Sequence, residues 1–441
     1  MSPLPSPPTA EAVARSWRAF PAGSNGEYGL PERLSVVLQR GEGCLVHDSE
    51  GREFLDMTMG WGSVLLGHAH PGITAAVSTQ AAAGTNFAHV SEPSLRLAES
   101  ILEISPACDQ LRMCASGTEA TLHCLRLARA FRGRAGILKF EGSYHGSHEI
   151  GTTSLFGRRF LPFPQPEPLG GSMSDRERAD ILVAPFNDAE TAIALIARHA
   201  AELAAVICEP LHRCLPPEPG FLAALRQACS EHGVLLIFDE VVTGFRLARG
   251  GAQEKYGVVP DLVAYGKALG GGLPLGVYGG RREIMERVEE QRLTEDDYVW
   301  TASTTGGNPV SAAAGLAVLE AVSEEGFYQR LNATGEMVRE GMRRVLRDAG
   351  REACVIGDGP LAQVVFRPGP IRSSRDIWQG DPAAGRRLML ALFERQVFLN
   401  PLGTKLYLSA AHDEPACREF LDRFASAVAA APKVRPRITT T

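Results

Sequence analysis

The sequence predicts an α/β protein with a mostly parallel sheet in a large domain and a second, smaller domain. Apolar runs of strand length alternate with helical patterns of about 10–15 residues between positions 111 and 265. Such alternation is typical of crossover units, whose parallel strands are covered by helices on both faces. The chain has 441 residues, which is more than one core of ordinary size holds. We therefore expect at least two lobes.

The predicted elements follow in chain order from a hairpin near the N-terminus. Residues 44–56 contain two strand-like runs around a Gly-containing turn, and apolar spacing predicts helices over 71–80 and 95–104. Residues 154–178 are rich in Pro, Gly, Ser and charge, so we expect an exposed loop there. The alternating region comprises predicted strands over 111–115, 136–140, 205–208, 234–238 and 262–265, and predicted helices over 118–131 and 220–232.

This order of elements predicts three segments. Residues 1–70 contribute an N-terminal segment to the small domain, and residues 71–310 form the large domain. Residues 311–441 supply a linking helix and the C-terminal small domain. The linking helix is Ala-rich, begins after Asn308-Pro309 and is expected to reach about Val322.

The composition excludes several classes of partner. The formal charge is 45 − 51 = −6, whereas proteins that bind nucleic acids or membrane surfaces usually carry a basic excess. No apolar run reaches the roughly 18 residues of a membrane helix, and the Pro-rich start lacks the pattern of a secretory signal. The nine cysteines show no metal-binding spacing. We expect reduced, mostly buried thiols in a cytoplasmic protein without a metal.

A glycine turn after the run 111–115 is a candidate phosphate site. Ser116-Gly117-Thr118 opens the following helix, and glycine lets the backbone approach a ligand closely. The free N–H groups and the positive end of the helix dipole suit a phosphate, and the hydroxyls of Ser116 and Thr118 can add donors. Simple N-capping of the helix explains the same residues without a ligand.

An aspartate and a lysine follow two later strand-like runs. Asp239 ends the run 234–238, where a buried carboxylate is costly without a partner. A protonated pyridine nitrogen would be such a partner, and an ion pair or a helix cap would be another. Lys267 follows the run 262–265 and precedes three glycines. A lysine is usually a solvated charge, but a buried amine can form a Schiff base. With the phosphate turn, this pair predicts pyridoxal 5′-phosphate (PLP) on Lys267.

Further motifs make a family resemblance specific. They are Ser116–Thr121 with Arg126–Arg129, Phe140–Gly146, Asp239–Arg246, Pro260–Leu262, Gly266-Lys267, Gly270–Leu273 and Gly307–Pro309. On these motifs the chain resembles a class III aminotransferase of PLP fold type I, and it is most similar to the glutamate-1-semialdehyde 2,1-aminomutase branch. The resemblance runs from about Pro21 to Ala430. It implies an α/β fold in which the N- and C-terminal parts together build a small α+β domain.

The resemblance implies three catalytic residues and their surroundings at the cofactor ring. Lys267 carries PLP covalently and moves the proton between the substrate carbon and the cofactor carbon. Asp239 pairs with the pyridine nitrogen. Tyr144 stacks on one face of the ring and Val241 packs on the other. Glu209, in the Glu-Pro segment that the family shares, belongs to the cofactor-binding set.

The resemblance also implies a shared active site. Ser116, Gly117 and Thr118 hold the phosphate from one subunit, and Thr304 reaches it from the second subunit. The expected assembly is a homodimer whose two active sites each contain residues of both chains. Trp61 matches a position that lines the substrate pocket, although a hydrophobic anchor explains it equally well.

The sequence departs from the aminomutase at substrate-contact positions. Gly26 and Gly29 stand where the aminomutase has the Ser and Arg that grip the substrate carboxylate. Arg213 replaces a small residue, and Lys405 falls near the position of a gating Glu. The cofactor residues are intact, so we expect retained chemistry on a different substrate. Arg213 and Lys405 can hold an anion and Glu27 a cationic or hydroxylated group, but each can also be a solvated surface charge.

The predicted function is PLP-dependent transfer of an amino group to or from a carbonyl-containing small molecule. An intramolecular amino shift, as in the aminomutase, is the alternative. A transaminase needs both an amino donor and a carbonyl acceptor, whereas an aminomutase turns over one substrate alone. Racemase or decarboxylase chemistry on the same scaffold is a third interpretation. A dehydrogenase is disfavoured because no G-x-G-x-x-G motif follows a strand.

Overall fold

A seven-stranded sheet lies at the centre of the computed structural model, which describes residues 10–26, 30–171, 173–401 and 403–430. In sheet order the strands are β4 (Gln110–Cys114), β10 (Gly276–Gly280), β9 (Leu262–Tyr265), β8 (Leu235–Glu240), β7 (Leu203–Cys208), β5 (Gly136–Phe140) and β6 (Ile181–Ala184). β10 runs antiparallel to β4 and β9, and the other neighbours are parallel. The expected α/β fold with a mostly parallel sheet is confirmed.

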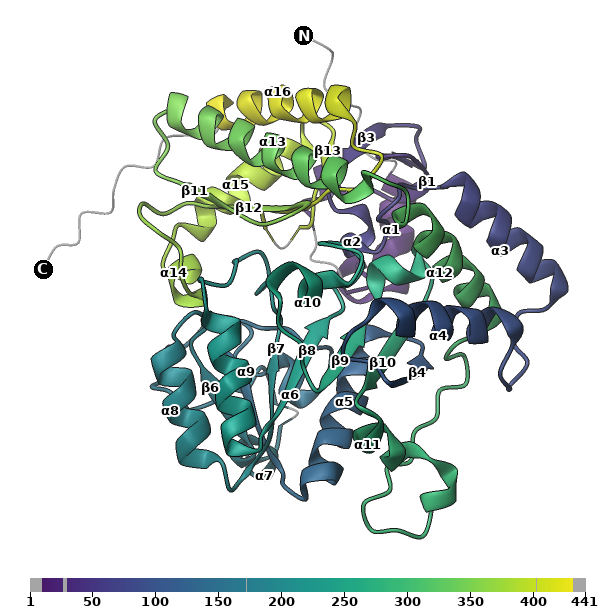
Figure 1. Cartoon of the computed structure of the whole chain (residues 1–441). Coiled ribbons are helices and arrows are strands. Elements are labelled where there is room, and N and C mark those ends of the chain that lie inside the picture. Colours follow the sequence, from purple (N-terminus) through teal and green to yellow (C-terminus); the bar gives the residue numbers. More distant parts are fainter. Residues whose placement is uncertain (1–9, 27–29, 172, 402, 431–441) are drawn as a thin grey trace, which may run out of the picture.

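Helices cover both faces of this sheet (Figure 1). Along β8, Leu236 and Phe238 belong to one hydrophobic core, whereas Leu235 and Ile237 belong to another. The first core includes side chains of α4 (Glu92–Ile104), α8 (Ala189–His199) and α9 (Phe221–His232), and the second includes side chains of α5 (Gly117–Arg132) and α11 (Arg282–Met285). Burial on both faces explains why the central strands are apolar throughout, which is the pattern that predicted them.

The C-terminal part forms a separate core around a small sheet. This sheet has the order β11 (Cys354–Ile356), β12 (Leu361–Val365) and β14 (Lys405–Tyr407), all antiparallel. Figure 1 shows α13 and α16 side by side at the top of the molecule. The helices of this part are α13 (Phe327–Asp348), α14 (Ser374–Trp378), α15 (Pro382–Phe393) and α16 (Glu414–Ala430).

A four-stranded sheet joins the two ends of the chain. β1 (Leu38–Glu42), β2 (Leu45–Asp48) and β3 (Glu53–Asp56) are antiparallel, and β13 (Val397–Phe398) adds to β3 in parallel. The expected hairpin over 44–56 is therefore present, and N- and C-terminal segments pack together. The domain boundaries at residues 70 and 310 stay a prediction.

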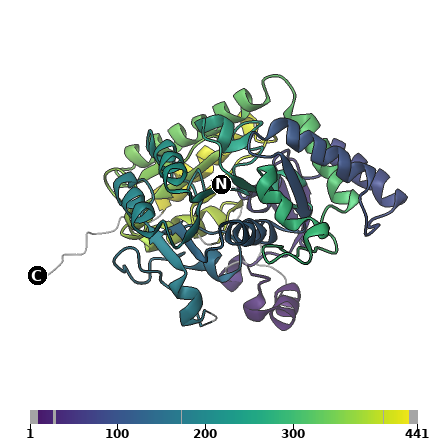
Figure 2. The ribbon, with the colours of Figure 1, turned by 60° about the horizontal axis from the view of Figure 1, so that its bottom comes forward.

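Two long helices link these parts. α3 (Pro71–Ala83) packs along α12 (Pro309–Val322), which also contacts α4. α12 begins as expected after Asn308, whose Oδ1 accepts a hydrogen bond from Ser311 N (2.9 Å). The first helix, α1 (Ala10–Ala19), lies at the edge of the molecule (Figure 2).

The stretch 154–178 is an exposed loop only in part. Ser154 and Glu167 are buried: Ser154 N donates to Glu167 O (2.8 Å), and Glu167 N donates to Ser154 Oγ (2.9 Å). A short helix, α7 (Asp175–Ala179), starts from a capping box between Ser174 and Glu177. Polar composition misses this burial because polar groups can be buried once their hydrogen bonds are satisfied.

The remaining elements are short. They are α2 (Met59–Gly62), α6 (Glu149–Thr152), α10 (Gly251–Tyr256), and the 3₁₀ turns η1 (Pro21–Gly23), η2 (Glu32–Leu34), η3 (Lys267–Gly270), η4 (Glu286–Val288) and η5 (Glu290–Arg292). All nine cysteines are free, and all but Cys44 and Cys354 are buried, as expected. Within the described ranges, no helix has the length and apolar character to span a membrane.

Candidate active site

Three of the sequence motifs meet at the carboxyl edge of the central sheet. The turn before α5, the end of β8 and the η3 turn after β9 all lie there, as ligand sites of such sheets do. A Cβ on Gly266 would lie 3.4 Å from Val241 Cγ1 and 3.6 Å from the Cα of Gly117. Residues more than a hundred positions apart are therefore neighbours.

The turn at the start of α5 has the form expected of a phosphate cradle. Ser116 is the N-cap, and its Oγ accepts from Glu119 N (3.2 Å). A Cβ at Gly117 would lie 2.7 Å from Val241 Cγ1, so the backbone packs closely against Val241 here and only glycine fits. Thr118 Oγ1 accepts from Ser147 N (3.3 Å). The N-capping interpretation is thus correct for Ser116, and the free N–H groups of the first turn remain available to an anion.

Asp239 is buried at the end of β8 and pairs with a histidine that our sequence interpretation did not single out. His145 Nδ1 lies 2.7 Å from Asp239 Oδ2, while Asp239 Oδ1 accepts from Val241 N (3.1 Å). The other ring nitrogen, His145 Nε2, is buried without a hydrogen-bond partner in the described chain. His145 follows Tyr144 in the motif Phe140–Gly146, and a buried aspartate needs a partner. Together these two facts could have predicted the pairing from the sequence.

Lys267 presents an unpaired amine to this edge. It is half-buried, and its ammonium makes no hydrogen bond or ion pair with any described residue. Burial lowers the pKa of Lys267, Arg213 and Lys405 lower it further, and Tyr407 and Asp239 oppose this. Its φ of +43° is uncommon for a residue other than glycine. Strained backbone with an amine of lowered pKa is typical of a nucleophilic lysine.

Glu209 ties two other predicted residues together. Its Oε1 accepts from Tyr144 N (2.8 Å) and its Oε2 from Arg213 N (3.2 Å). Burial alone would raise the pKa of Glu209, but Arg213, His212 and other cations lower it to about 2. The carboxylate is therefore ionised and holds the backbone of Tyr144 and Arg213 in place.

Arg213 and Lys405 come together although they are 192 residues apart. Lys405 is buried, and its Nζ donates to Arg213 O (2.8 Å). Arg213 has a φ of +60°, and its guanidinium lies 5.8 Å over the Tyr144 ring. The ammonium of Lys405 is thus engaged by the backbone, whereas the guanidinium of Arg213 faces the ring.

Thr304 makes no hydrogen bond to the described residues of this group. It is exposed, and its carbonyl accepts from Asn86 Nδ2 (3.0 Å). Its neighbour Ser303 donates from Oγ to Glu119 Oε2 (2.9 Å) at the start of α5. Glu27 lies outside the described residues, as does Gly29.

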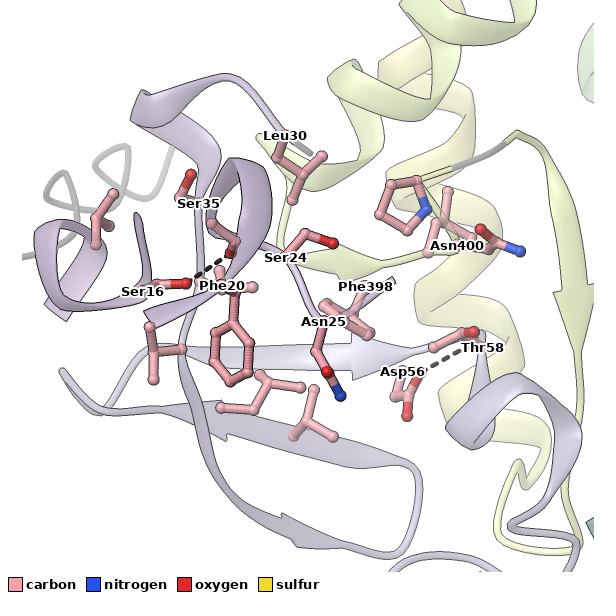
Figure 3. Close-up of a pocket in the computed structure, with 18 of the residues that line it drawn as sticks. Ser16, Phe20, Ser24, Asn25, Leu30, Ser35, Asp56, Thr58, Phe398 and Asn400 are labelled. Atoms are coloured by element: carbon pink, nitrogen blue, oxygen red, sulfur yellow. Dashed lines mark hydrogen bonds between the residues drawn. The ribbon is translucent and has the colours of Figure 1, made fainter. Parts of the chain in front are cut away.

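Trp61 is one of the residues that line a cavity of about 460 Å³ between the N-terminal segment and the end of β13. Figure 3 shows this cavity. The wall is mostly apolar and includes Phe20 and Phe398. Trp61 belongs to α2, in which Met59, Gly60, Trp61 and Gly62 all have positive φ, so the turn is left-handed. α2 contacts both η3 and β14.

A sheet that brings a glycine turn, a buried aspartate and an unpaired lysine to one edge defines an enzyme that binds PLP. The chain belongs to the class III aminotransferase family, whose model (Aminotransferase class-III) matches residues 30–377. It is 38% identical over 422 residues to a glutamate-1-semialdehyde 2,1-aminomutase of Desulforudis audaxviator (strain MP104C), covering 94% of this chain and 95% of the relative. The protein is thus a PLP-dependent enzyme.

Solved structures support the fold. An omega-transaminase from Sphaerobacter thermophilus has a TM-score of 0.89 and 34% identity, and the match covers 96% of this chain and 98% of that one. A beta-phenylalanine aminotransferase from Variovorax paradoxus has a TM-score of 0.80 and 30% identity, covering 95% and 92%. The predicted PLP fold type I is confirmed.

Proposed function

We propose that this enzyme transfers an amino group between a carboxylate-bearing small molecule and a carbonyl acceptor, with Arg213 as the carboxylate anchor. The observation that carries the proposal is the Arg213 guanidinium, which has no hydrogen bond or ion pair in the described chain. A cation that is largely removed from water is normally paired. A substrate carboxylate supplies the missing partner, since a guanidinium can bind it through two hydrogen bonds.

The residues at the sheet edge fit PLP. The free N–H groups at the start of α5 suit its phosphate, to which Ser116 and Thr118 can donate. Asp239, oriented by His145, is placed to keep the pyridine nitrogen protonated. PLP supplies the electron sink for the amino-bearing carbon when it is bound.

The family resemblance supports further roles. Lys267 would bind the cofactor covalently through its amine and hold the proton that moves between carbon atoms. Tyr144 and Val241 would pack on the two faces of the ring. Glu209 orients Tyr144 and Arg213 through their backbone N–H groups. These residues bind and orient, while Lys267 alone exchanges the proton.

A homodimer completes the proposed site. Thr304 is exposed rather than turned to its own sheet edge, and large apolar side chains near it, among them Phe87 and Trp300, are more than half exposed. Exposed apolar groups of this size are typical of protein interfaces. We infer that Thr304 reaches the phosphate bound by the partner chain.

An intramolecular amino shift is the second candidate, favoured by the 38% identity to an aminomutase. Gly26 argues against the aminomutase substrate, because it lacks a side chain and no atom of the described residues, apart from its chain neighbours, lies within 4 Å of the position that a Cβ would take. Loss of one charged hydrogen bond weakens binding roughly 10–150-fold.

The decisive experiment is a donor and acceptor screen with the holoenzyme. A transaminase loses the visible absorbance of bound PLP when an amino donor is added, and a keto acid restores it. Arg213→Ala should raise KM for a carboxylate donor more than it lowers kcat, because a remote anchor supplies mainly uniform binding. Efficient conversion of glutamate-1-semialdehyde alone, with no second substrate, would overturn the proposal in favour of the amino shift.

A further inference from the structure

Tyr407 of β14 is held rigidly beside the cofactor site. It is 3% exposed, and its N–H donates to Met57 O (2.8 Å). Lys405 Nζ lies 4.9 Å from the ring centroid and the Arg246 guanidinium 5.9 Å from it. A Cβ on Gly62 would lie 2.6 Å from Tyr407 Cδ1, so α2 rests directly on the ring edge. The ring can neither tilt nor shift without disturbing these neighbours.

The hydroxyl of Tyr407 has no hydrogen-bond partner in the described chain. Buried tyrosines usually find a partner for this group, as the buried Tyr265 and the half-buried Tyr256 do here. Tyr265 OH lies 2.7 Å from Ser105 Oγ, and Tyr256 OH donates to Asp358 Oδ2 (2.8 Å). The Tyr407 hydroxyl is therefore a donor that lacks an acceptor.

Cations from four segments of the chain lie near this donor. Lys405 comes from β14 itself, Arg213 from the segment after β7, Lys267 from η3 and Arg246 from the segment after β8. The nearby carboxylates are already engaged: Glu209 accepts from Tyr144 N and Arg213 N, and Asp239 pairs with His145. The pocket therefore has an excess of positive charge and of donors, which suits an anion.

Lys405 joins Tyr407 to Arg213. Its ammonium lies over the Tyr407 ring and donates to the backbone carbonyl of Arg213. Lys405 thus contacts both residues that carry a group without a partner, Tyr407 with its hydroxyl and Arg213 with its guanidinium. The left-handed backbone of Arg213 is held in this position by two contacts, from Lys405 to its carbonyl and from its N–H to Glu209.

We propose that Tyr407 is a specificity-determining residue whose hydroxyl donates a hydrogen bond to the same substrate carboxylate that Arg213 binds. Lys405 is a positioning residue that holds both groups at the right separation. This inference deepens the proposed function and rests on its assignment of Arg213 as the carboxylate anchor. It places the specificity for acidic substrates on β14 and on the segment after β7.

The test uses binding of a substrate-like carboxylate, 3-phenylpropanoate, to the holoenzyme, measured by calorimetry and by the change in PLP absorbance. 3-Phenylpropan-1-ol, which lacks the charge, is the matched probe. Tyr407→Phe should weaken 3-phenylpropanoate binding about 10-fold or more and leave binding of the alcohol unchanged. Arg213→Ala should have the same effect. The double variant should lose less binding free energy for 3-phenylpropanoate than the two single variants lose together.

Tyr256→Phe is the control variant, because it also removes a tyrosine hydroxyl, here one that donates to Asp358, but lies on α10 outside the site. It should bind 3-phenylpropanoate as the wild type does. No saturable binding of 3-phenylpropanoate to the wild type, or equal affinities in wild type and Tyr407→Phe, would overturn the proposal.

The pH profile of binding gives a second readout. Burial alone raises the pKa of Tyr407, but Lys405, Arg213 and Lys267 lower it below its ordinary value. Loss of the phenolic proton removes the donor and adds a negative charge beside the carboxylate. Affinity for 3-phenylpropanoate should therefore fall as the pH rises in the wild type, and this fall should be absent in Tyr407→Phe. Parallel profiles would contradict the role of the hydroxyl.

Failure of this inference and failure of the proposed function are distinguishable. If the donor screen finds no amino transfer but the carboxylate still binds through Tyr407, the anion site stands and the reaction assignment falls. If amino transfer occurs with the same KM for carboxylate donors in wild type and Tyr407→Phe, the reaction stands and Tyr407 has no part in specificity.

Discussion

At the scale of single residues, the chemistry depends on polar groups that the fold leaves without partners. The ammonium of Lys267, the guanidinium of Arg213 and the Nε2 of His145 lack hydrogen bonds in the described chain. Most buried polar groups are satisfied, so unsatisfied ones need a reason. The shared reason that we propose is a cofactor and a substrate that bind at one sheet edge.

We predict that Lys267 carries the cofactor. Borohydride reduction of the holoenzyme and peptide mapping should place the pyridoxyl group on the Lys267 peptide, because this amine is unpaired and has a lowered pKa. Lys267→Ala should lose the PLP absorbance and nearly all turnover. Lys255→Ala, which removes a lysine paired with Asp358, should keep both. A label on another lysine would refute the assignment.

Asp239→Asn should retain PLP but slow proton removal by roughly 100–1000-fold, the cost of losing one preorganised electrostatic contact. An amide cannot stabilise a protonated pyridine nitrogen by charge, whereas the hydrogen bond to His145 can persist. Stopped-flow absorbance after mixing with an amino donor measures this step. A rate within a few-fold of wild type would show that Asp239 does not contact the ring.

His412 makes the folded state sensitive to acid. Burial lowers its pKa to about 4, and its Nδ1 accepts from Ser409 N (3.0 Å), a contact that protonation breaks. The folded pKa lies below the ordinary value near 6.5, so this stabilisation is complete above that pH and is lost as the pH falls toward 4. We expect a loss of about 3 kcal/mol across this window.

Urea unfolding at a series of pH values checks this expectation. His412→Gln can still accept from Ser409 N and donate to the carbonyl of Asp56, but it does not titrate. Its free energy of unfolding should be lower at neutral pH and should fall less steeply with acid. Equal slopes would assign the acid sensitivity to other groups.

At the scale of elements, α2 is the part of the site with the most strained backbone. Four successive residues with positive φ form a left-handed turn, which is unfavourable at Met59 and Trp61 because they carry a Cβ. Asp56 stabilises its start by accepting from Thr58 N (2.8 Å) and Met59 N (3.0 Å). The turn directs Trp61 to the cavity in Figure 3 while Gly62 supports Tyr407.

Substitution of Gly62 tests this close packing. Gly62→Ala combines a φ of +82° with a Cβ 2.6 Å from the Tyr407 ring. Gly51→Ala is the matched control, since Gly51 has a φ of +79° but nothing within 4 Å of a Cβ. The control should cost about 1 kcal/mol of unfolding free energy, and Gly62→Ala about 1–3 kcal/mol more. Denaturant unfolding measures both variants. Equal losses of unfolding free energy would mean that the Tyr407 ring moves aside at no cost.

At the scale of the whole molecule, three sheets are joined by contacts between distant parts of the chain, and the two smaller sheets share one hydrophobic core. β13 adds to β3 across more than 300 residues, and Lys405 of β14 holds Arg213 of the central part. The site therefore depends on how the C-terminal part sits on the large sheet. The proposed homodimer, argued from exposed apolar residues near Thr304, would extend this dependence to a second chain.

A mixing experiment tests the shared site. Lys267→Ala and Thr304→Ala should each be nearly inactive, and a hybrid dimer of the two should regain one intact site of two. Activity of the refolded mixture, with light scattering to follow the assembly, measures this. A monomer at assay concentration, or no recovery from two inactive variants, would count against the shared site.

The sequence by itself determined the cofactor chemistry, because each cofactor motif is local. Ser116-Gly117-Thr118 at a strand-to-helix turn, Asp239 at a strand end and Lys267 beside glycines follow from short-range patterns of hydrophobicity and turn residues. The helices over 117–132 and 309–322 were predictable for the same reason, since helical periodicity needs no distant partner.

Only the tertiary structure decided which side chains face one another. The antiparallel insertion of β10, the pairing of His145 with Asp239, and the union of Arg213, Lys405 and Tyr407 join residues about a hundred or more positions apart. Such contacts depend on strand order and packing, which a local pattern does not encode. The contacts among the residues proposed to bind the substrate therefore required the tertiary structure, whereas the cofactor could be predicted from the sequence.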